Sequence, residues 1–393
     1  MGTSELERPR WVGVGRSVDN DSRTAALAAT GAALTGDDPK LLMVFAAITH
    51  DLAVVRDAIA EIAPGVPVIG CTTHGEIGEG GPVDGSVTVT ALGGAGFAIS
   101  TGVAEHVAGR QREAGAEVAQ CVDQVEERAY KVLVLLTDGL VRDQESIVRG
   151  CYGVVGAAVP LFGGAAADGW QMSGTFLLGE GRVLTDAVVA VTIASDAPLA
   201  VAVEHGWEKL GQPMIVTSSG NGRVYTLDDK PALDVYLGRL DAPAAAYTDP
   251  ETFVEFALPR PLGVQRRSGI EARNLSTAVD LEGRSIGGGN AIDHGGLAWA
   301  MTGDEDSILQ AADAACDNAI DGLGGRQPIG MLTFSCAALR AVLGEEGIQR
   351  EGERIGKRAN GVPFAGFYTY GEIARVRGID GFHNQTLVVL AFA

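Results

Sequence analysis

The residues best suited to chemistry lie in a phrase that occurs twice, at 65–77 (GVPVIGCTTHGEI) and at 361–373 (GVPFAGFYTYGEI). Each copy ends an apolar run with Thr-x-Gly-Glu-Ile, which supplies Thr73 and Glu76 in the first copy and Glu372 in the second. Strand ends are where α/β proteins place ligand contacts. A carboxylate with flanking hydroxyls and free backbone N–H groups suits a small polar solute that carries an amine.

A plainer interpretation of the phrase stays open beside that one. Gly-Glu-Ile can close a β-turn in which the glutamate caps a neighbouring backbone segment. A fainter third copy at 159–170 (VPLFGGAAADGW) keeps Val-Pro-x-x-Gly in step and places an acid, Asp168, just beyond. Three copies of one phrase predict an internal repeat. Either a shared architecture or a shared function can preserve such a repeat.

A cysteine offers a second kind of chemistry. Cys336 follows an apolar strand pattern in SCAALR, and Arg340 lies four residues further along the expected helix. A thiol at a helix N-terminus near an arginine can have a lowered pKa, which would suit the nucleophile of an amide hydrolase or a redox sensor. The alternative, which we favour, is a buried thiol that behaves as a small hydrophobic group.

Two histidines occupy turns beside these motifs. His74 lies inside the first copy of the phrase, where the second copy has Tyr370. His383 precedes Asn384 in the turn before the last expected strand. Either histidine could act as a general base or as an axial haem ligand, and either could be an ordinary turn or core residue. The sequence has no metal-binding motif.

Composition limits the classes of partner. The chain has 393 residues, 50 acids against 30 bases and a formal net charge of -20. Such a chain repels the phosphates of nucleic acids and anionic membrane surfaces. The five cysteines are far apart and form no C-x-x-C pair, so no disulfide framework is expected. No apolar run approaches the length of a spanning helix and no secretory signal is visible, so we expect a soluble, cytoplasmic protein.

The order of the expected elements repeats along the chain. Helix, strand, helix, strand, strand is predicted three times, and each βαββ-type unit ends a strand at one copy of the phrase. The fold class is therefore α/β with mixed α+β sheets, in two domains with pseudo-symmetric strand-to-turn junctions. The expected domains are a lead-in at 1–20, an N-terminal domain at 21–220 and a C-terminal domain at 221–393.

Some stretches carry weaker expectations. The stretch 111–128 is predicted as one helix, and 198–300 departs from the repeat and reads as β-rich. Within it, 242–261 is dense in Ala and Pro and is expected to be a linker or an excursion from the domain.

The chain resembles the FIST proteins, in which an N-terminal and a C-terminal FIST domain occur in tandem. The N-terminal resemblance rests on VPVIGCTTHGEI, YKVLVLLTDGL and VPLFGGAAADGW. The C-terminal resemblance rests on HGWEKLGQPMIVTSSGNGRVYTLDDKPALDVY, LPRPLGV, LTFSCAALR and GVPFAGFYTYGEI with FHNQT. It covers nearly the whole chain beyond its first 20 or so residues.

The resemblance implies an intracellular signal-input module that binds a small ligand, with amino acids as the proposed class and no cofactor. Some similar proteins are associated with haem and nitric oxide sensing, which is the alternative for His74 or His383. With no output domain visible in the sequence, signalling is expected to need a partner protein such as a histidine kinase. The ligand-binding candidates are the matched polar positions Thr73, Glu76, Asp168, Cys336, Arg340, Tyr370, Glu372, His383 and Asn384.

Overall fold

Three units with one strand order make up the body of the protein in the computed structural model, which describes residues 8–220, 222–266, 269–275, 279–287, 292–376 and 381–393. In each unit the first strand is antiparallel to the last, the last is antiparallel to the central strand, and the central strand is parallel to the one that ends at the phrase. The orders are β1-β5-β2-β3, β6-β11-β7-β8 and β12-β24-β20-β21. The α/β fold class is confirmed, and the repeat expected from the sequence is a repeat in space.

The elements of the three units follow one another along the chain. Those of the first are β1 (Trp11–Ser17), α1 (Ser22–Ala33), β2 (Pro39–Ala47), α2 (Leu52–Ile62), β3 (Val68–Thr73), β4 (Glu76–Gly78) and β5 (Val87–Gly93). Those of the second are β6 (Phe97–Glu105), α3 (Gln111–Ala119), η1 (Gln120–Asp123), β7 (Tyr130–Thr137), α4 (Gln144–Val155), β8 (Leu161–Ala165), β9 (Leu177–Gly179), β10 (Arg182–Leu184) and β11 (Ala187–Ser195). Those of the third are β12 (Leu199–Glu204), α7 (Glu305–Asp321), β20 (Gly330–Cys336), α8 (Ala337–Ala359), β21 (Phe364–Thr369), β22 (Glu372–Arg375), β23 (Phe382–His383) and β24 (Leu387–Phe392).

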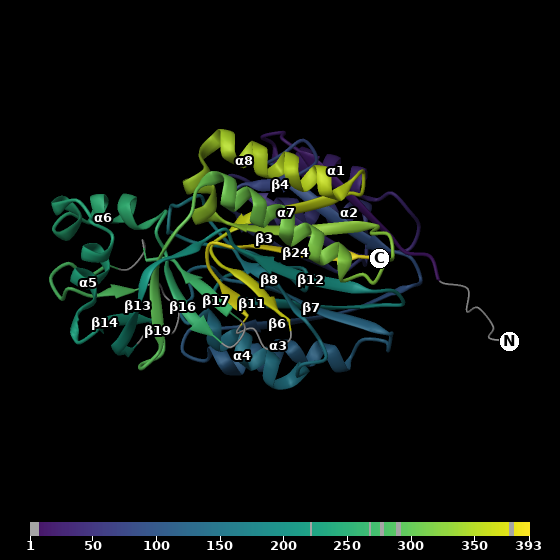
Figure 1. Cartoon of the computed structure of the whole chain (residues 1–393). Coiled ribbons are helices and arrows are strands. Elements are labelled where there is room, and N and C mark those ends of the chain that lie inside the picture. The colour runs from purple at the N-terminus through teal and green to yellow at the C-terminus, as the bar shows by residue number, and fades with distance from the viewer. Residues whose placement is uncertain (1–7, 221, 267–268, 276–278, 288–291, 377–380) are drawn as a thin grey trace.

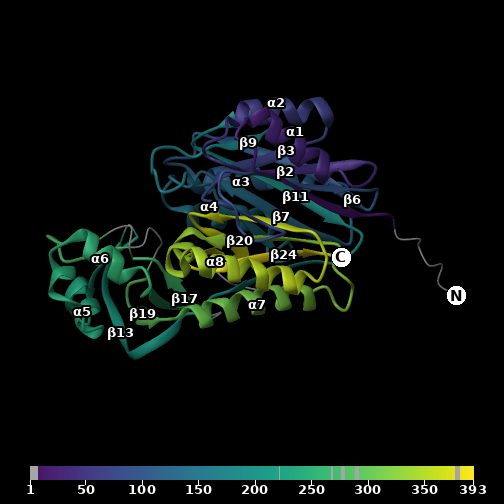
Figure 2. The same ribbon diagram turned by 90° about the horizontal axis from the view of Figure 1, so that it is seen from above.

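The units exchange edge strands in a closed cycle. Strand β4 of the first unit pairs with β21 of the third, β22 of the third pairs with β8 of the second, and β9 of the second pairs with β3 of the first. Strands β4 and β22 begin at the glutamate of the first and the last copy of the phrase, and β9 follows the copy at 159–170. The two helices of each unit pack together on the outside of the body, α1 with α2, α3 with α4 and α7 with α8 (Figures 1 and 2). The cycle therefore draws the three strand ends toward one another.

The inner faces of the three sheets share one apolar core. Phe45 of β2, Phe162 of β8 and Phe334 of β20 are fully buried in it. The rings of Phe334 and Phe162 lie 4.6 Å apart between centroids, and those of Phe45 and Phe334 lie 5.3 Å apart. Aromatic packing from all three units therefore fixes their relative positions.

The glycine shared by the three copies of the phrase has a steric cause. A Cβ at Gly70, Gly163 or Gly366 would lie 2.4, 2.0 or 1.5 Å from a carbonyl oxygen of the neighbouring parallel strand. The carbonyls of Pro67, Pro160 and Pro363 each accept from an N–H group of the same neighbouring strand. The shared glycine is thus explained by strand packing alone.

A lobe is inserted into the third unit between β12 and α7 (Figure 1). Its sheet follows the order β15-β14-β13-β19-β16-β17, and β18 pairs with β14. The lobe consists of β13 (Glu208–Gly220), β14 (Arg223–Leu227), β15 (Lys230–Pro231), α5 (Ala232–Arg239), η2 (Ala244–Tyr247), α6 (Pro250–Ala257), β16 (Leu262–Arg266), β17 (Gly269–Arg273), β18 (Ile286–Gly287) and β19 (Leu297–Thr302). The β-rich departure from the repeat that the sequence predicts at 198–300 is this lobe.

Two predicted elements are corrected by the structure. The stretch 242–261 is not a linker, because it contains η2 and α6; Asp249 caps α6 through the backbone N–H of Thr252, and Pro250 occupies the first turn. The helix predicted at 111–128 ends at Ala119 and is followed by the short 3₁₀ turn η1. Val122 is buried within that turn, so the apolar spacing runs on past the end of the helix.

Candidate functional site

The three strand ends meet in a ring of backbone hydrogen bonds. We call residues 73–76, 166–169 and 369–372 the first, second and third junctions. His74 N donates to the carbonyl of Tyr368 at 3.0 Å, which joins the first junction to the third unit. Ala167 N donates to the carbonyl of Thr72, and Ala165 N donates to that of Gly371, each at 2.9 Å. Each junction is therefore attached to another unit, and the ring closes.

Glu76 is used within its own unit. It is fully buried, and its carboxylate accepts from the hydroxyl of Thr73 and from the backbone N–H and hydroxyl of Ser86 at 3.0 and 2.7 Å. Burial raises the pKa of Glu76 to about 7, against the opposing effect of these hydrogen bonds. Ser86 immediately precedes β5, so Glu76 caps the start of the last strand of its unit.

The other two units use the same device. The carboxylate of Glu372 accepts from the backbone N–H of Thr386, just before β24, at 3.1 Å and from the Thr386 hydroxyl at 2.9 Å. In the second unit the acid comes from β7 instead, and Asp138 accepts from the backbone N–H of Asp186, just before β11, at 2.7 Å. The interpretation in which the glutamate serves a neighbouring backbone segment therefore describes these side chains.

All three junctions contribute to a surface cluster, which α8 completes and which we call the junction cap: His74, Asp168, Trp170, Tyr370 and Arg340. The Tyr370 hydroxyl donates to Asp168 at 2.6 Å and accepts from the backbone N–H of Trp170 at 2.7 Å. The Trp170 and Tyr370 rings stack with centroids 5.2 Å apart, and the His74 ring meets Trp170 edge-on at 5.1 Å. Trp170 is 41% exposed and has a backbone φ of 64°, which is strained for a bulky residue.

Asp168 holds the loop that carries Trp170. Its carboxylate accepts from the backbone N–H groups of the three loop residues 172–174 as well as from Tyr370. Burial opposes ionisation, but the Tyr370 hydrogen bond and the backbone donors outweigh it, so the pKa of Asp168 lies below its usual value. Burial, with the adjacent Asp168, raises the pKa of Tyr370. Asp168 is therefore ionised and Tyr370 is a neutral donor at physiological pH.

Arg340 closes the cap from the side of the third unit. It donates to the carbonyl of His74 at 2.7 Å and forms two contacts with Asp84, at 2.5 and 2.7 Å. Burial lowers the pKa of His74 to about 4, with a further contribution from Arg340. The imidazole is therefore neutral, and its Nδ1 is buried with no hydrogen-bond partner in the structure.

The Cys336 thiol and the Arg340 guanidinium lie in different surroundings. The guanidinium faces Asp84 and the ring of Tyr368, whereas the thiol is buried beside Glu372. Burial, and then the Glu372 carboxyl, raise the pKa of the Cys336 thiol well above its usual value. This environment is the opposite of the electropositive one that activates a thiolate.

His383 belongs to a second cluster, where the lobe meets the body, and Asn384 next to it is buried. His383 is buried, its Nε2 lies 2.8 Å from the carbonyl of Ala374, and burial lowers the pKa of the ring. Two charged residues that the sequence did not single out, Glu271 and Arg273 on β17, are buried beside it. The signal that could have found them is Glu-x-Arg within an otherwise apolar strand pattern.

Neither histidine has surroundings that fit a haem. The His383 ring is enclosed and uses Nε2 on a backbone carbonyl. The His74 ring is packed against Trp170 and lies 6.4 Å from the Tyr370 ring. A haem needs one ring nitrogen facing a space as large as the macrocycle, and the packed rings leave none beside His74. Within the described ranges, no group of three or more His, Cys, Asp and Glu side chains is placed to hold a metal ion.

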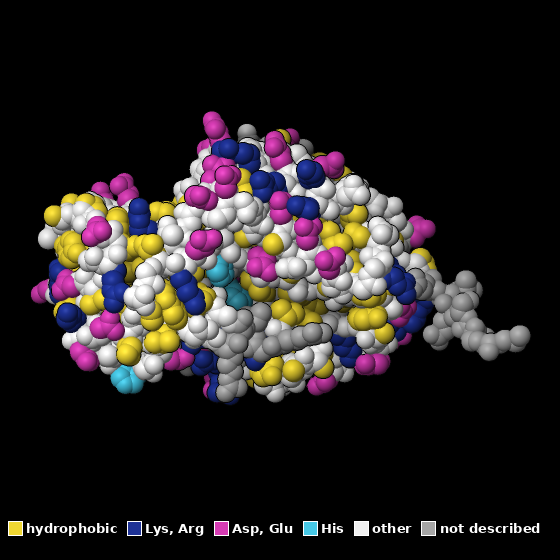
Figure 3. Space-filling view, viewed as in Figure 1, with side chains coloured by type: hydrophobic (Ala, Val, Ile, Leu, Met, Phe, Trp, Pro, Cys, Tyr) yellow, Lys and Arg dark blue, Asp and Glu magenta, His cyan; other side chains and the backbone are white. Residues whose placement is uncertain are grey.

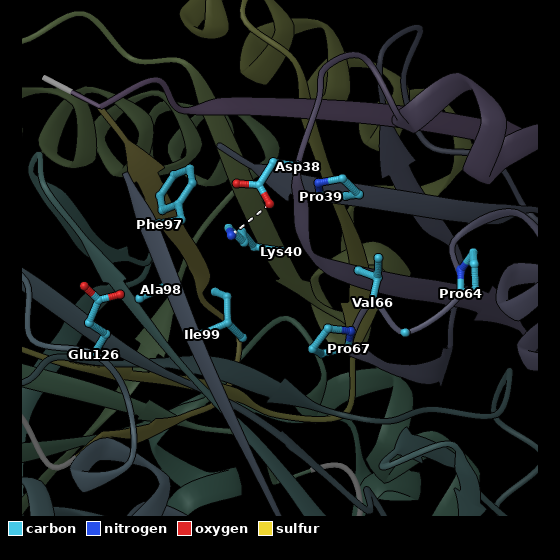
Figure 4. Close-up of a pocket in the computed structure, with 11 residues that line it drawn as sticks. Asp38, Pro39, Lys40, Pro64, Val66, Pro67, Phe97, Ala98, Ile99 and Glu126 are labelled. Atoms are coloured by element: carbon cyan, nitrogen blue, oxygen red, sulfur yellow. Dashed lines mark ion pairs between the residues drawn. The ribbon is translucent and has the colours of Figure 1, made fainter. Parts of the chain in front are cut away.

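A groove of about 660 Å³ lies far from the junctions, at the opposite ends of β2 and β3 (Figure 4). Its walls include Pro39, Pro67 and Ile99, and Lys40 and Asp38 form an ion pair of 2.8 Å at its edge. None of the predicted site residues lines it. In the part of the chain that the structure describes, no helix is both long enough and apolar enough to cross a membrane.

Comparison with models of protein families tests the resemblance to the FIST proteins that the motifs suggest. The FIST N domain matches residues 40–230 and the FIST C domain matches residues 232–375. The chain belongs to the FIST family. The two matches meet inside the lobe, whereas the exchanged strands β4 and β22 carry parts of each match into sheets built from the other. The two FIST segments are therefore interlaced in space; the domain limits expected at 20 and 220 stay a prediction.

Similar sequences and remotely similar structures add little to this assignment. Two uncharacterized proteins of Mycobacterium tuberculosis, from strains CDC 1551 and H37Rv, are 25% identical over 235 residues, which is 58% of this chain and 60% of each relative. A cyanuric acid hydrolase from A. caulinodans has a TM-score of 0.26 at 12% identity, over 47% of this chain and 71% of that one. PurL complexed with ADP from T. maritima has a TM-score of 0.25 at 10% identity, over 98% and 72%. TM-scores this low carry no argument about fold or function.

Proposed function

We propose that this FIST protein is a sensory protein that binds a small polar, amino-acid-like ligand at the junction cap. The observation that carries the proposal is the exposed Trp170, held in a left-handed backbone conformation beside the unpartnered Nδ1 of His74. Backbone strain in a bulky residue persists only where the surroundings enforce it, and such residues cluster at ligand clamps and switches. Here Asp168 and Tyr370 enforce it.

The chemistry of the cap suits a ligand that carries an amine. The stacked faces of Trp170 and Tyr370 favour a cationic head group, and Asp84, whose side chain is 65% exposed, offers a carboxylate nearby. A neutral His74 can accept a hydrogen bond through Nδ1. An ammonium group with a short polar body matches these three features.

The ring of junctions gives such a ligand a way to act at a distance. Arg340 connects the cap to α8, and His74 connects it to β21, so a ligand that moves Trp170 changes contacts of two units. We propose that binding shifts the population of unit arrangements and that a separate protein, such as a histidine kinase, recognises the change. The support for the kinase is the family resemblance alone.

Ligand titration followed by Trp170 is the direct test. Intrinsic fluorescence and the thermal midpoint are measured against a panel of amino acids and small amines, because a ligand specific for the folded state raises the midpoint by mass action. Binding should be lost in Trp170→Ala and weakened in His74→Ala. Tyr225→Ala is the matched control, because Tyr225 lies on the lobe and is 42% exposed. A ligand that binds Trp170→Ala as tightly as the parent protein contradicts the proposed site, and no response across the panel contradicts the function.

A further inference from the structure

The strand β6 forms the longest open edge among the three sheets of the body. It ends the sheet order β23-β22-β8-β7-β11-β6, and all nine of its residues pair with β11. It pairs with no other strand in the described part of the chain. Among the other terminal strands of these sheets, β1 and β12 have seven and six residues, and β4, β10 and β23 have three, three and two. The open row of backbone groups is therefore longest on β6.

The sequence of β6 does not guard this edge. Natural proteins protect open edges with short strands, charged side chains, prolines or bulges. Residues 97–104 include no charge and no proline, and their pairing with β11 has no bulge. Glu105 alone is charged; its side chain is bonded to Arg182 at 2.6 Å, and its carbonyl accepts from Arg110 at 3.0 Å. Residues 99–103 are half-buried, so this uncharged edge is open to another chain.

The phase of the pairing with β11 shows which backbone groups face the open side. Asp196 N donates to the carbonyl of Gly96 at 3.1 Å, one residue before β6 begins. In an antiparallel pair, residues that bond to the partner strand alternate with residues that face away from it. Ile99, Thr101 and Val103 therefore direct their N–H and C=O groups away from β11. These groups can bond to a further strand.

We propose that β6 pairs with β6 of a second copy of this chain, antiparallel and about a two-fold axis at Thr101. In such an isologous contact, residue i of one copy faces residue j of the other, and j faces i. With Thr101 on the axis, Ile99 faces Val103 of the second copy. These residues carry the outward backbone groups, so each pair exchanges both of its N–H···O bonds. The proposal does not rest on the function proposed for the junction cap.

The side chains suit this register. The facing pairs are Ile99–Val103, Thr101–Thr101, Ala98–Ala104 and Ser100–Gly102. The first two join β-branched residues, which are favourable cross-strand partners, and no like charges meet. The chain as a whole has a formal net charge of -20, but Figure 3 shows acidic and basic side chains interspersed over one face of the molecule. Charges away from the contact are screened beyond about 8 Å at physiological ionic strength.

The groove at the start of β6 gives room to the end of the second strand. It has a volume of about 660 Å³ and lies between residues 97–99 of β6 and the segment of Val66 and Pro67 in the first unit (Figure 4). In the proposed register, Glu105 of the second copy lies beside this groove. Its bond to Arg182 leaves that end of the strand without an unpaired charge. The groove therefore accepts the end of the strand without repulsion.

The molar mass of the full chain in solution is the first test. Light scattering at about 100 μM, where an association with a micromolar dissociation constant is nearly complete, should give a mass near twice 40.6 kDa, and dilution should lower it. Hydrogen exchange at the amides of Ile99, Thr101 and Val103 should slow as the protein concentration rises. A monomer at this concentration overturns the proposal.

Opposite charges at residue 101 locate the interface. Thr101→Lys and Thr101→Glu each set like charges against one another, and each should raise the dissociation constant at least about tenfold. An equimolar mixture of the two variants should restore the dimer, because lysine then faces glutamate. Tyr225→Lys on the lobe is the matched control, since Tyr225 is 42% exposed, and should leave the dimer unchanged.

Folding of each variant is checked by circular dichroism. If a charged variant fails to fold, Thr101→Pro takes its place, because it removes an N–H on the open side and leaves the bonds to β11 in place. Thr101→Pro should be monomeric. A dimer that persists in Thr101→Lys or Thr101→Pro, or that Tyr225→Lys dissociates, has its interface elsewhere and overturns the proposal.

Discussion

Glu76 and Glu372 end the same phrase and cap equivalent strands, yet their hydrogen bonding differs. Both oxygens of Glu76 accept from N–H or O–H donors, whereas Glu372 accepts from such donors through Oε2 alone and its third donor is the Cys336 thiol. The difference arises at the preceding threonine. Thr73 donates its hydroxyl to Glu76, whereas Thr369 is bonded at 2.6 Å to the carbonyl of Ala165 in the second unit.

The shared sequence of the phrase therefore determines the turn, whereas contacts with the neighbouring unit determine the hydrogen bonds and the pKa of the glutamate. Burial raises the pKa of both carboxyl groups, to about 8 for Glu372 and to about 7 for Glu76. The third donor differs in kind, because the Cys336 thiol is a weaker donor to Glu372 than the Thr73 hydroxyl is to Glu76. The three predictions that follow begin with the largest expected effect.

Replacing each of the two glutamates by alanine should produce the largest difference in the free energy of unfolding. Glu76→Ala leaves the Thr73 hydroxyl and two donors of Ser86 without an acceptor, and should lower the free energy of unfolding by about 3 kcal/mol. Glu372→Ala removes the acceptor of two Thr386 donors and should cost about 1 kcal/mol less. Urea denaturation of both variants at one pH measures the difference. Equal losses would contradict the account of the two carboxylates.

The position after each threonine gives a second comparison, His74 against Tyr370. Tyr370→Phe removes the bonds to Asp168 and to the Trp170 backbone, and should cost about 1–2 kcal/mol in unfolding free energy. His74→Phe should cost less than about 1 kcal/mol, because the Nδ1 that it removes has no partner. Denaturation followed by circular dichroism compares the two, with Tyr225→Phe on the lobe as a control. A larger loss in His74→Phe would show that the imidazole is bonded.

The smallest expected effect is a difference between the two glutamates in how the free energy of unfolding depends on pH. Both glutamates have raised pKa values in the folded state against an ordinary value of 4.5, so the stability that these two groups contribute is fully present below pH 4.5 and is lost as each loses its proton. The loss from Glu76 ends near pH 7, whereas that from Glu372 continues to about pH 8. Between pH 7 and 8 the parent protein should lose up to about 1 kcal/mol that Glu372→Gln retains. Glu76→Gln should keep the loss, and the reverse result would exchange the two assignments.

Much of the architecture was predictable from local sequence. The repeat of Val-Pro-x-x-Gly indicated three units, because only glycine allows the close approach of the parallel strand at Gly70 and Gly366. The α/β class and the β-rich lobe followed from apolar periodicity. The helix α6 was missed because Ala and Pro around it resemble a linker, although Asp249 before Pro250 is a helix-start signal.

The sequence by itself determined the three units, the order of their elements along the chain and the glutamates of the first and third units, since these depend on neighbours along the chain. The acid that caps the last strand of the second unit, Asp138, was not predicted. Only the tertiary structure decided which atoms those acids bond, because the exchanged strands bring each junction against a different unit. It also decided that Asp168 and Tyr370, 202 positions apart, hold Trp170 in place. The pairing of Glu271 with Arg273 beside His383 likewise depends on where the lobe meets the body. Contacts between segments that are far apart in the chain depend on how the units pack. The sequence pattern around any one residue therefore does not predict them.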